Sequence, residues 1–213
     1  MSDFDQQVFL NCPFDSEYEE LLKPLFFTVI SCGFKPRIAS ERLDSGEVGL
    51  EKIKEIILEC RFGIHDLSRC KSRDKGEYSR FNMPFELAFD LAIRDFHPDK
   101  RMIDKKILVL EEERFSLQKS LSDLSFSDPK CHDGDPEELV YQVRTWFAEL
   151  GYKNLKPPSG IWDDYNVFNS DLYEKKIKSG FNQKDIDRLP VPEFLSEIEK
   201  WFKKKTPSKN SAP

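Results

Sequence analysis

Short apolar runs alternate with amphipathic stretches along the first 150 residues of the chain. Three of the runs are typical of buried strands in a parallel sheet, which is covered on both faces, and they span residues 8–12, 62–67 and 106–110. A further run, residues 34–39, contains Pro36. Because proline cannot donate a hydrogen bond within a sheet, this strand is expected at a sheet edge.

The stretches between the runs carry apolar residues at helical spacing and predict helices near residues 16–32, 48–60, 82–94 and 136–150. Asp15 or Ser16 is expected to cap the first helix, Asn82 the third and Asp135 the fourth. Pro24 lies in the first helical pattern, so that helix either kinks there or begins its regular part near Lys23. The third helix is apolar on nearly every side, which predicts that it is largely buried.

This alternation predicts an α/β fold with three layers, in which a flavodoxin-like parallel sheet of about five strands is covered by helices on both faces. Residues 1–150 are expected to form this domain, and residues 115–126 fit a short helix followed by the fifth strand. Residues 151–205 predict a small helical appendage that begins with a proline-containing linker and ends with an amphipathic helix over 191–204. Residues 206–213 are expected to be a disordered tail.

Charge and composition disfavour nucleic acid, a membrane and a metal ion as binding partners. The chain of 213 residues has a formal net charge of −6, which disfavours a nucleic-acid binder because such proteins present a basic face. No apolar run approaches the roughly 18 residues of a membrane helix, so no membrane partner is expected. The five cysteines form no CxxC pair and the three histidines lie far apart, which favours a cytoplasmic protein without disulfides and without a bound metal.

The predicted parallel sheet indicates where a ligand would bind. In open parallel sheets, ligands bind beyond the carboxyl ends of the strands, where the strand order reverses. The residues that this rule selects are polar for the most part: Asn11, Cys12, Asp15, Glu41, Asp44, Asp66, Ser68, Arg69 and Asn82. Phe14 and Phe81 could stack on a base or pack in the core. Neither GxGxxG nor GxxxxGK[ST] occurs, so a glycine-rich phosphate cradle is not expected.

Glu86 is the candidate for a catalytic group. It forms a polar line with Asp90 and Arg94 along an otherwise apolar helix, and this line fits either an exposed edge with an Asp90–Arg94 ion pair or a functional carboxylate. A carboxylate in the first turn of a buried helix beside the crevice would be partly desolvated. Such a group could bind a ribose hydroxyl or stabilise an oxocarbenium ion.

Several other candidates have a purely structural alternative. Asp66 could bind a ligand or cap the turn that follows its strand. Ser68 and Arg69 could contact a phosphate or lie solvated in a loop. Cys12 is favoured as a buried thiol over a nucleophile, since no basic partner is evident, and His65 is favoured as a core residue.

Three segments in this order resemble the Toll/interleukin-1 receptor (TIR) fold, in particular bacterial TIR-like proteins with nucleotide-linked activity. They are VFLNCPFD (residues 8–15), SERLDSGEVGLEKIKEIILECRFGIHDLSR (40–69) and NMPFELAFDLA (82–92), and the resemblance covers about residues 7–110. The position of Glu86 is similar to that of the glutamate that cleaves NAD in enzymatic members. The same placement is similar to that of the glutamate in nucleoside 2-deoxyribosyltransferases, a related flavodoxin-like family.

The sequence departs from the TIR pattern at two places. It has Asn11 and Cys12 where many TIR domains have Ser-Tyr, and Phe81 is the nearest aromatic residue where a Trp precedes the glutamate helix. The contacts that would stack on a base are therefore the part of the pattern that this chain does not reproduce.

The resemblance implies a TIR-like enzyme that takes NAD as substrate, has no permanently bound cofactor and releases nicotinamide with a linear or cyclic ADP-ribose product. It implies that Glu86 stabilises the transition state and that the chain acts in bacterial antiphage defence, as a homo-oligomer or with a partner protein of the defence system. The alternatives are a deoxyribosyltransferase-like enzyme and a non-catalytic module that senses a nucleotide or binds a protein.

Overall fold

The computed structural model describes residues 3–15, 17–39, 49–68, 81–119, 121–122 and 128–205. Five parallel strands form one sheet in the order β2-β1-β3-β4-β5. The strands are β1 (Gln7–Asn11), β2 (Lys35–Arg37), β3 (Phe62–Asp66), β4 (Lys106–Glu111) and β5 (Lys130–Cys131). The chain order reverses between β1 and β3, as in flavodoxin-like folds, so the predicted fold class is confirmed.

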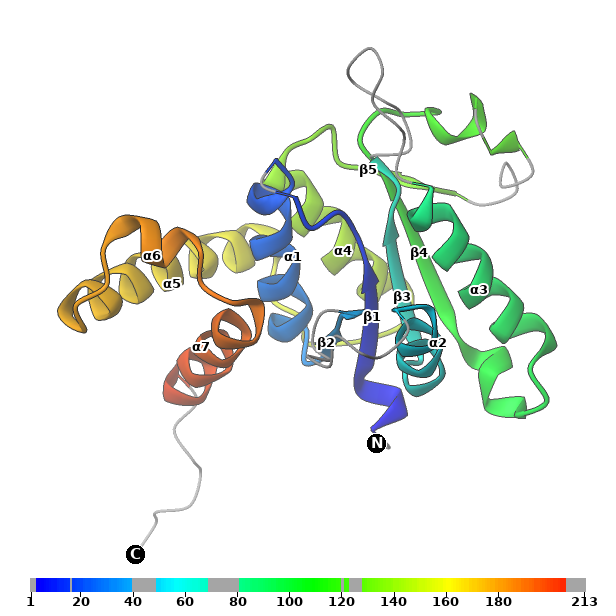
Figure 1. Cartoon of the computed structure of the whole chain (residues 1–213), viewed down its shortest axis with the longest axis horizontal. Helices are drawn as coiled ribbons and strands as arrows, with labels where there is room; N and C mark the ends of the chain where they lie inside the picture. Colours follow the sequence, from blue (N-terminus) through cyan, green and yellow to red (C-terminus); the bar gives the residue numbers. More distant parts are fainter. Residues whose placement is uncertain are drawn as a thin grey trace, which may run out of the picture.

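Helices cover both faces of the sheet, with α1 and α4 on one side and α2 and α3 on the other (Figure 1). The helices are α1 (Glu19–Ser31), α2 (Gly49–Glu59), α3 (Asn82–Phe96), α4 (Pro136–Glu149), α5 (Pro158–Lys178), α6 (Gln183–Asp187) and α7 (Val191–Lys205). Short 3-10 helices are η1 (Phe4–Gln6), η4 (Lys100–Asp104) and η5 (Leu117–Lys119).

Side chains alternate across β1 as expected for a central strand. Val8 and Leu10 join the core under α1 and α4, whereas Phe9 packs with Ile56 and Ile57 of α2 on the other side. Burial on both faces explains why the central strands read as continuous apolar runs. The edge strand predicted from its proline is confirmed, because β2 is the first strand in the sheet order.

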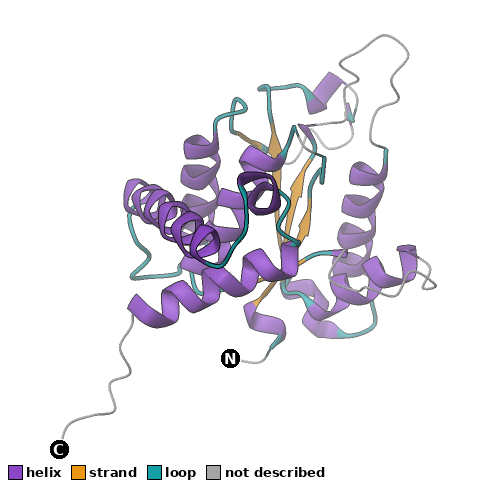
Figure 2. Cartoon of the chain, turned by 60° about the vertical axis from the view of Figure 1, so that its left-hand side comes forward, coloured by secondary structure: helices purple, strands orange, loops and turns teal. Residues whose placement is uncertain are grey.

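The C-terminal helices extend the core under α1 and α4 (Figure 2). Phe27 of α1 lies at the centre of this extension, with its ring centroid 5.4 Å from that of Phe168 in α5 and 5.6 Å and 5.1 Å from those of Trp201 and Phe202 in α7. The amphipathic helix predicted near 191–204 is confirmed as α7, and Ile198 on its apolar face is fully buried.

The predicted helix start is confirmed for α4, but the predicted caps of α1 and α3 are wrong. Asp135 caps α4 as predicted, since its side chain accepts a hydrogen bond from the backbone N–H of Glu137 at 2.8 Å. Helix α1 begins before Pro24 and continues through it, so a start near Lys23 is wrong, and its N-cap is Tyr18, without a side-chain cap. Asn82 is the first residue of α3 and does not cap it, because the N-cap position belongs to Phe81.

Two further expectations are corrected. Helix α3 is not largely buried: only Leu87 and Asp90 are buried in it, because just one side of the helix meets the sheet. The fifth strand does not fall within the described part of 115–126, where η5 lies, but follows at Lys130–Cys131. It holds only two residues and pairs with the last two of β4. None of the helices among the described residues is both long and apolar enough to cross a membrane.

Candidate active site at the carboxyl edge of the sheet

The ends of β1 and β3 bring three of the predicted site residues together. Cys12, directly after β1, is fully buried, and burial raises the pKa of its thiol well above the usual value. The negative charges of Asp66 and Glu86 raise the pKa of Cys12 further. These groups lie where the strand order reverses, the place where flavodoxin-like folds bind their ligands. The prediction that Cys12 is a buried thiol is confirmed.

Glu86 is partly buried in the second turn of α3, and not in the first turn as predicted, because the helix begins four residues earlier at Asn82. Burial raises the pKa of its carboxyl group to about 7. Among the residues that the structure describes, no side chain or backbone group donates a hydrogen bond to it. Glu86 is thus a carboxyl group that changes its protonation state near neutral pH and that no described residue holds by a hydrogen bond.

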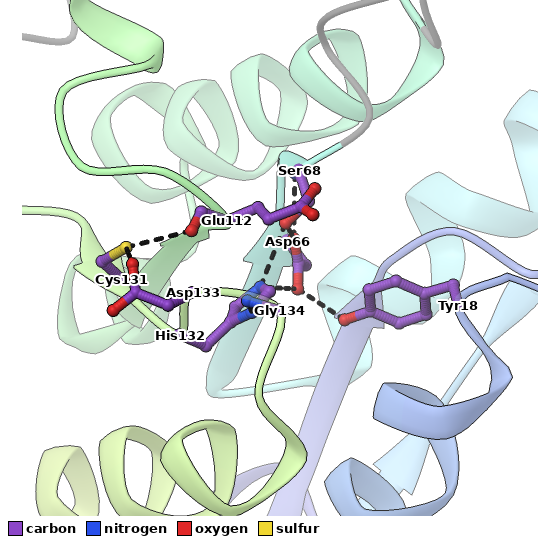
Figure 3. A network of polar contacts seen from close by, with 8 residues as sticks. All are labelled: Tyr18, Asp66, Ser68, Glu112, Cys131, His132, Asp133 and Gly134. Atoms are coloured by element: carbon purple, nitrogen blue, oxygen red, sulfur yellow. Dashed lines mark hydrogen bonds and ion pairs between the residues drawn. The ribbon is translucent and has the colours of Figure 1, made fainter. Parts of the chain in front are cut away.

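Asp66 has the opposite environment (Figure 3). The carboxylate is completely buried at the end of β3. Its Oδ2 atom lies 2.5 Å from the hydroxyl of Tyr18, which donates to it, and 3.0 Å from Nε2 of His132. Its Oδ1 atom accepts hydrogen bonds from the backbone N–H of Ser68, at 2.9 Å, and from the hydroxyl of Ser68. Asp66 therefore joins α1, β3 and the turn after β5.

The interactions within this network oppose the effect of burial on the pKa values of Asp66 and His132. Burial by itself would raise the pKa of Asp66, but the hydrogen bond and charge of His132, with the hydroxyls of Ser68 and Tyr18, hold it below the usual range. Burial by itself would lower the pKa of His132, and the hydrogen bond and charge of Asp66 outweigh that effect and raise it. The network consequently holds a charged carboxylate at neutral pH and excludes Asp66 as a proton donor there.

Ser68, His132 and Asp66 contain the residue types of a serine hydrolase triad but not its geometry. The Ser68 hydroxyl donates to Asp66, and Nε2 of His132 contacts both Ser68 and Asp66, at 3.0 Å each. The other ring nitrogen, Nδ1, accepts the backbone N–H of Gly134 at 3.1 Å. No base is therefore positioned to remove the proton of Ser68, and Asp66 serves as the turn cap that was one of its two predicted roles.

A second polar network is buried on the α3 side of the sheet. Nε2 of His65 lies 3.0 Å from Oδ2 of Asp90, and Nζ of Lys105 lies 3.1 Å from Oδ1 of Asp90. The side-chain amide of Asn11 donates to the backbone oxygen of Met83 at 2.8 Å and lies 3.0 Å from Nδ1 of His65. Asn11 thus ties β1 to the start of the helix that carries Glu86. His65 is a core residue, as predicted.

This network corrects the expected Asp90–Arg94 ion pair. Asp90 is fully buried, and Arg94 pairs with Asp95 instead, at 2.7 Å. Gly63 of β3 makes room for the buried carboxylate: a Cβ atom there would lie 2.2 Å from Oδ2 of Asp90, which is closer than atoms can approach. Lys105 also donates to the backbone oxygen of Ile57 at 2.8 Å, so the network joins α2, α3 and β4.

The remaining predicted site residues lie around this edge. Phe14 and Phe81 are 46% and 71% exposed, so the alternative that they pack in the core is wrong for both. Asp15 is partly buried and accepts the backbone N–H of Tyr18 at 3.1 Å, and Asn82 is exposed. Glu41, Asp44 and Arg69 lie outside the residues that the structure describes.

A pocket of about 340 Å³ opens beside Phe14 and Asp15, between α1 and the segment that leads into α7. Its apolar lining comes from both elements and comprises Leu22, Phe26, Leu189, Val191 and Phe194. This volume lies at the lower end of the range for small-molecule sites. The pocket thus combines an exposed aromatic ring with an apolar hollow on the α1 side of the molecule.

No local sequence pattern points to Tyr18 or His132, the two long-range partners of Asp66. The nearest signal is the turn after β5, in which Asp133 and Gly134 have φ angles of 52° and 71°. Such left-handed positions favour Asp and Gly, and an HDGD segment therefore marks a tight turn that can aim a histidine at a strand end.

The arrangement offers two carboxyl groups of different kinds: Glu86, which has a pKa near neutrality and no hydrogen-bond donor among the described residues, and Asp66, a structural carboxylate that stays charged. Among the described residues, no three His, Cys, Asp or Glu side chains are grouped as metal ligands would be. Comparison with known proteins yields no match to a family model, to a curated protein or to a solved structure.

Proposed function

We propose that this chain is a TIR-like enzyme that cleaves the N-glycosidic bond between nicotinamide and ribose in NAD, with Glu86 as the catalytic residue. The single observation that carries the proposal is the state of Glu86: it is partly buried in α3, the helix whose start is tied to the end of β1 by Asn11, and burial raises its pKa to about 7. Carboxylates tuned in this way are typical of sites that handle developing positive charge or protons.

The reaction needs little from the protein besides this carboxylate. When the bond between C1′ of the ribose and N1 of nicotinamide breaks, the electron pair leaves with nicotinamide, which departs as a neutral molecule and requires no proton. Positive charge develops on the ribose, and the Glu86 carboxylate stabilises it. Water, or a nucleophilic atom of the same nucleotide, then bonds to C1′ and loses a proton to Glu86, which gives linear or cyclic ADP-ribose.

Asp66 is less suited to this role. Its oxygens are occupied by Tyr18, Ser68 and His132, so a substrate would have to displace partners that the fold itself supplies. By this proposal, the exposed ring of Phe14 stacks on a base or on nicotinamide. By the same proposal, the setting is bacterial antiphage defence, in which the enzyme depletes NAD or makes a nucleotide signal.

The test is to incubate concentrated protein with NAD and to follow nicotinamide and ADP-ribose products by chromatography and mass. Glu86→Gln is expected to lower nicotinamide release by about 100- to 1,000-fold, the usual effect of removing one group that stabilises transition-state charge. Asp95→Asn is the matched control, since it removes an exposed carboxylate from the same helix and should leave turnover unchanged.

Parallel incubations with purine and pyrimidine deoxynucleosides separate the rival enzyme. Base exchange that depends on Glu86, without nicotinamide release, would assign the chain to deoxyribosyl transfer. If neither substrate is turned over while NAD shifts the melting temperature of the wild-type chain, the crevice is a nucleotide sensor and the enzymatic proposal fails.

A further inference from the structure

Helix α3 carries an apolar stripe that faces solvent. Phe81, Phe85 and Phe96 are 71%, 53% and 84% exposed, and Ala88 and Ala92 between them are exposed as well. Their spacing of three or four residues sets them on one side of the helix, opposite the side that buries Leu87 and Asp90. The α3 stripe, defined by these five residues, is thus a second apolar face on a helix whose first face already meets the sheet.

No described element covers this stripe. Helix α3 lies at the outer edge of the molecule (Figure 1). Most of an amphipathic helix's exposed side is polar, and a helix that is apolar all round is normally buried on every side. The exposed apolar side of α3 therefore fits a surface that a partner covers.

The sequence of the stripe is complementary to itself. If two copies of α3 pack antiparallel about a two-fold axis near the middle of the helix, Phe85 of each copy meets Ala92 of the other, and Phe81 meets Phe96. A large ring then lies against a small residue at two symmetric places, which is the arrangement that lets two helices approach closely. The end residues add aromatic contacts between rings.

The area agrees with this arrangement. The exposed parts of the three rings amount to on the order of 400 Å² in each copy, taking about 200 Å² for a whole aromatic side chain. Two copies together, with the alanines and the edges of the stripe, would bury about 1,000 Å². That value is the lower limit for a specific interface and indicates a dimer of moderate affinity that forms and separates reversibly.

We infer that the α3 stripe is the homodimer surface of this protein and that two chains pair through it antiparallel. The inference does not depend on the proposed chemistry. It does mean that the helix that carries Glu86 is also the helix that meets the second chain, so association acts directly on the element that positions this carboxylate.

The test is the solution mass of the full chain, measured by sedimentation over a range of concentrations. The wild-type chain is expected to shift from one to two chains as concentration rises. Phe85→Glu is expected to weaken association at least about 30-fold, since it replaces a central contact with a charge. Tyr141→Glu is the matched control: this exposed aromatic residue lies on α4, and its replacement should leave the dimer intact. Circular dichroism would verify that both variants fold.

A rescue experiment tests the register. Adding Ala92→Lys to Phe85→Glu places a lysine of one chain against a glutamate of the other, twice per dimer, and is expected to restore association at low salt. A wild-type chain that remains monomeric at its highest soluble concentration would overturn the inference, as would a Phe85→Glu chain that still dimerises. Failure of the rescue would overturn the antiparallel pairing. A monomer that sediments with lipid vesicles would assign the stripe to a membrane surface instead.

Discussion

Asp66 and Glu86 lie at the same edge of the same sheet, but the fold treats their carboxyl groups in opposite ways. Asp66 is completely buried and accepts hydrogen bonds from Tyr18, Ser68 and His132, which hold its pKa below the usual range. Glu86 is less buried, yet no described residue donates to it and burial raises its pKa to about 7. Burial alone therefore does not decide the protonation of a carboxyl group; the donors around it do.

The difference separates a structural role from a chemical one. A carboxylate that is saturated with donors from three segments stabilises the folded chain and has no capacity left for a ligand. A carboxyl group that is desolvated without donors destabilises the folded chain when it is charged, and such a cost is found where function requires it. The following predictions test this assignment of roles.

The largest effect is expected from Asp66→Ala. The change leaves the buried imidazole of His132 and the hydroxyl of Tyr18 without their partner, and it should lower the free energy of unfolding by about 3–5 kcal/mol. Urea unfolding at pH 7 would measure it, with the exposed Asp95→Ala as a control that should change stability by less than about 0.5 kcal/mol.

The loss of stability caused by Asp66→Ala should depend on pH. Because the pKa of Asp66 is lowered by folding, its contribution is present above its usual pKa of 3.8 and is lost as the pH falls through the folded-state value. The gap between wild type and Asp66→Ala should therefore narrow in acid. A gap that stays constant from neutral pH down through this range would contradict the hydrogen bonds assigned to the Asp66 carboxylate.

The next effect concerns catalysis by Glu86. If the carboxylate form is the active one, cleavage of NAD should be constant above pH 7 and fall about tenfold per pH unit below it, to about 100-fold less at pH 5. Initial rates of nicotinamide release at saturating NAD would measure the profile. A flat profile across this range would show that the raised pKa of Glu86 does not control the rate.

Tyr18→Phe should have a smaller effect. The ring still fills its place beside β1, but one hydrogen bond to a buried carboxylate is lost, and the free energy of unfolding should fall by about 2 kcal/mol. The same urea experiment would compare this loss of unfolding free energy with that of Asp66→Ala. A loss as large as that of Asp66→Ala would mean that Tyr18 contributes through packing and not through its hydroxyl alone.

The smallest effect has the opposite sign. Glu86→Gln should stabilise the chain by about 1–2 kcal/mol at pH 8, a value reduced from the full pKa shift because the side chain is partly solvated. Since folding raises the pKa of Glu86 from 4.5 to about 7, the wild type loses stability as the pH rises between these values. Thermal melts of both proteins should thus coincide near pH 4.5 and diverge toward pH 8.

The layout of the sheet could be predicted from the sequence because its central strands are apolar on both faces. The run predicted at 62–67 became β3 (Phe62–Asp66), and that at 106–110 became β4 (Lys106–Glu111). The rule that ligands bind beyond strand ends then selected Asn11, Cys12 and Asp66 without knowledge of the structure. The fifth strand was misplaced since Lys130 and Cys131 carry no apolar pattern that could mark a strand.

The partners within the site could not be predicted, because local spacing says nothing about residues that are distant in sequence. The positions of Asp90 and Arg94 predicted an ion pair along α3, but Asp90 instead faces His65 and Lys105 across the sheet. Nothing in the sequence around Lys105 indicates that it meets a buried carboxylate, or that Gly63 leaves the space for that carboxylate. Likewise, His132 meets Asp66 only through the turn after β5.

The long sequence separation of these partners has a consequence for how the chain folds. Tyr18 and His132 stand 48 and 66 residues from Asp66, so the carboxylate can be buried with its full set of donors only after the chain has closed loops of these lengths. Until β5 has docked, Asp66 lacks the hydrogen bond from His132, and burying its carboxylate is unfavourable. Assembly of the sheet edge is thereby coupled to the arrival of its last strand, which favours an all-or-none transition for this half of the molecule and slows its formation.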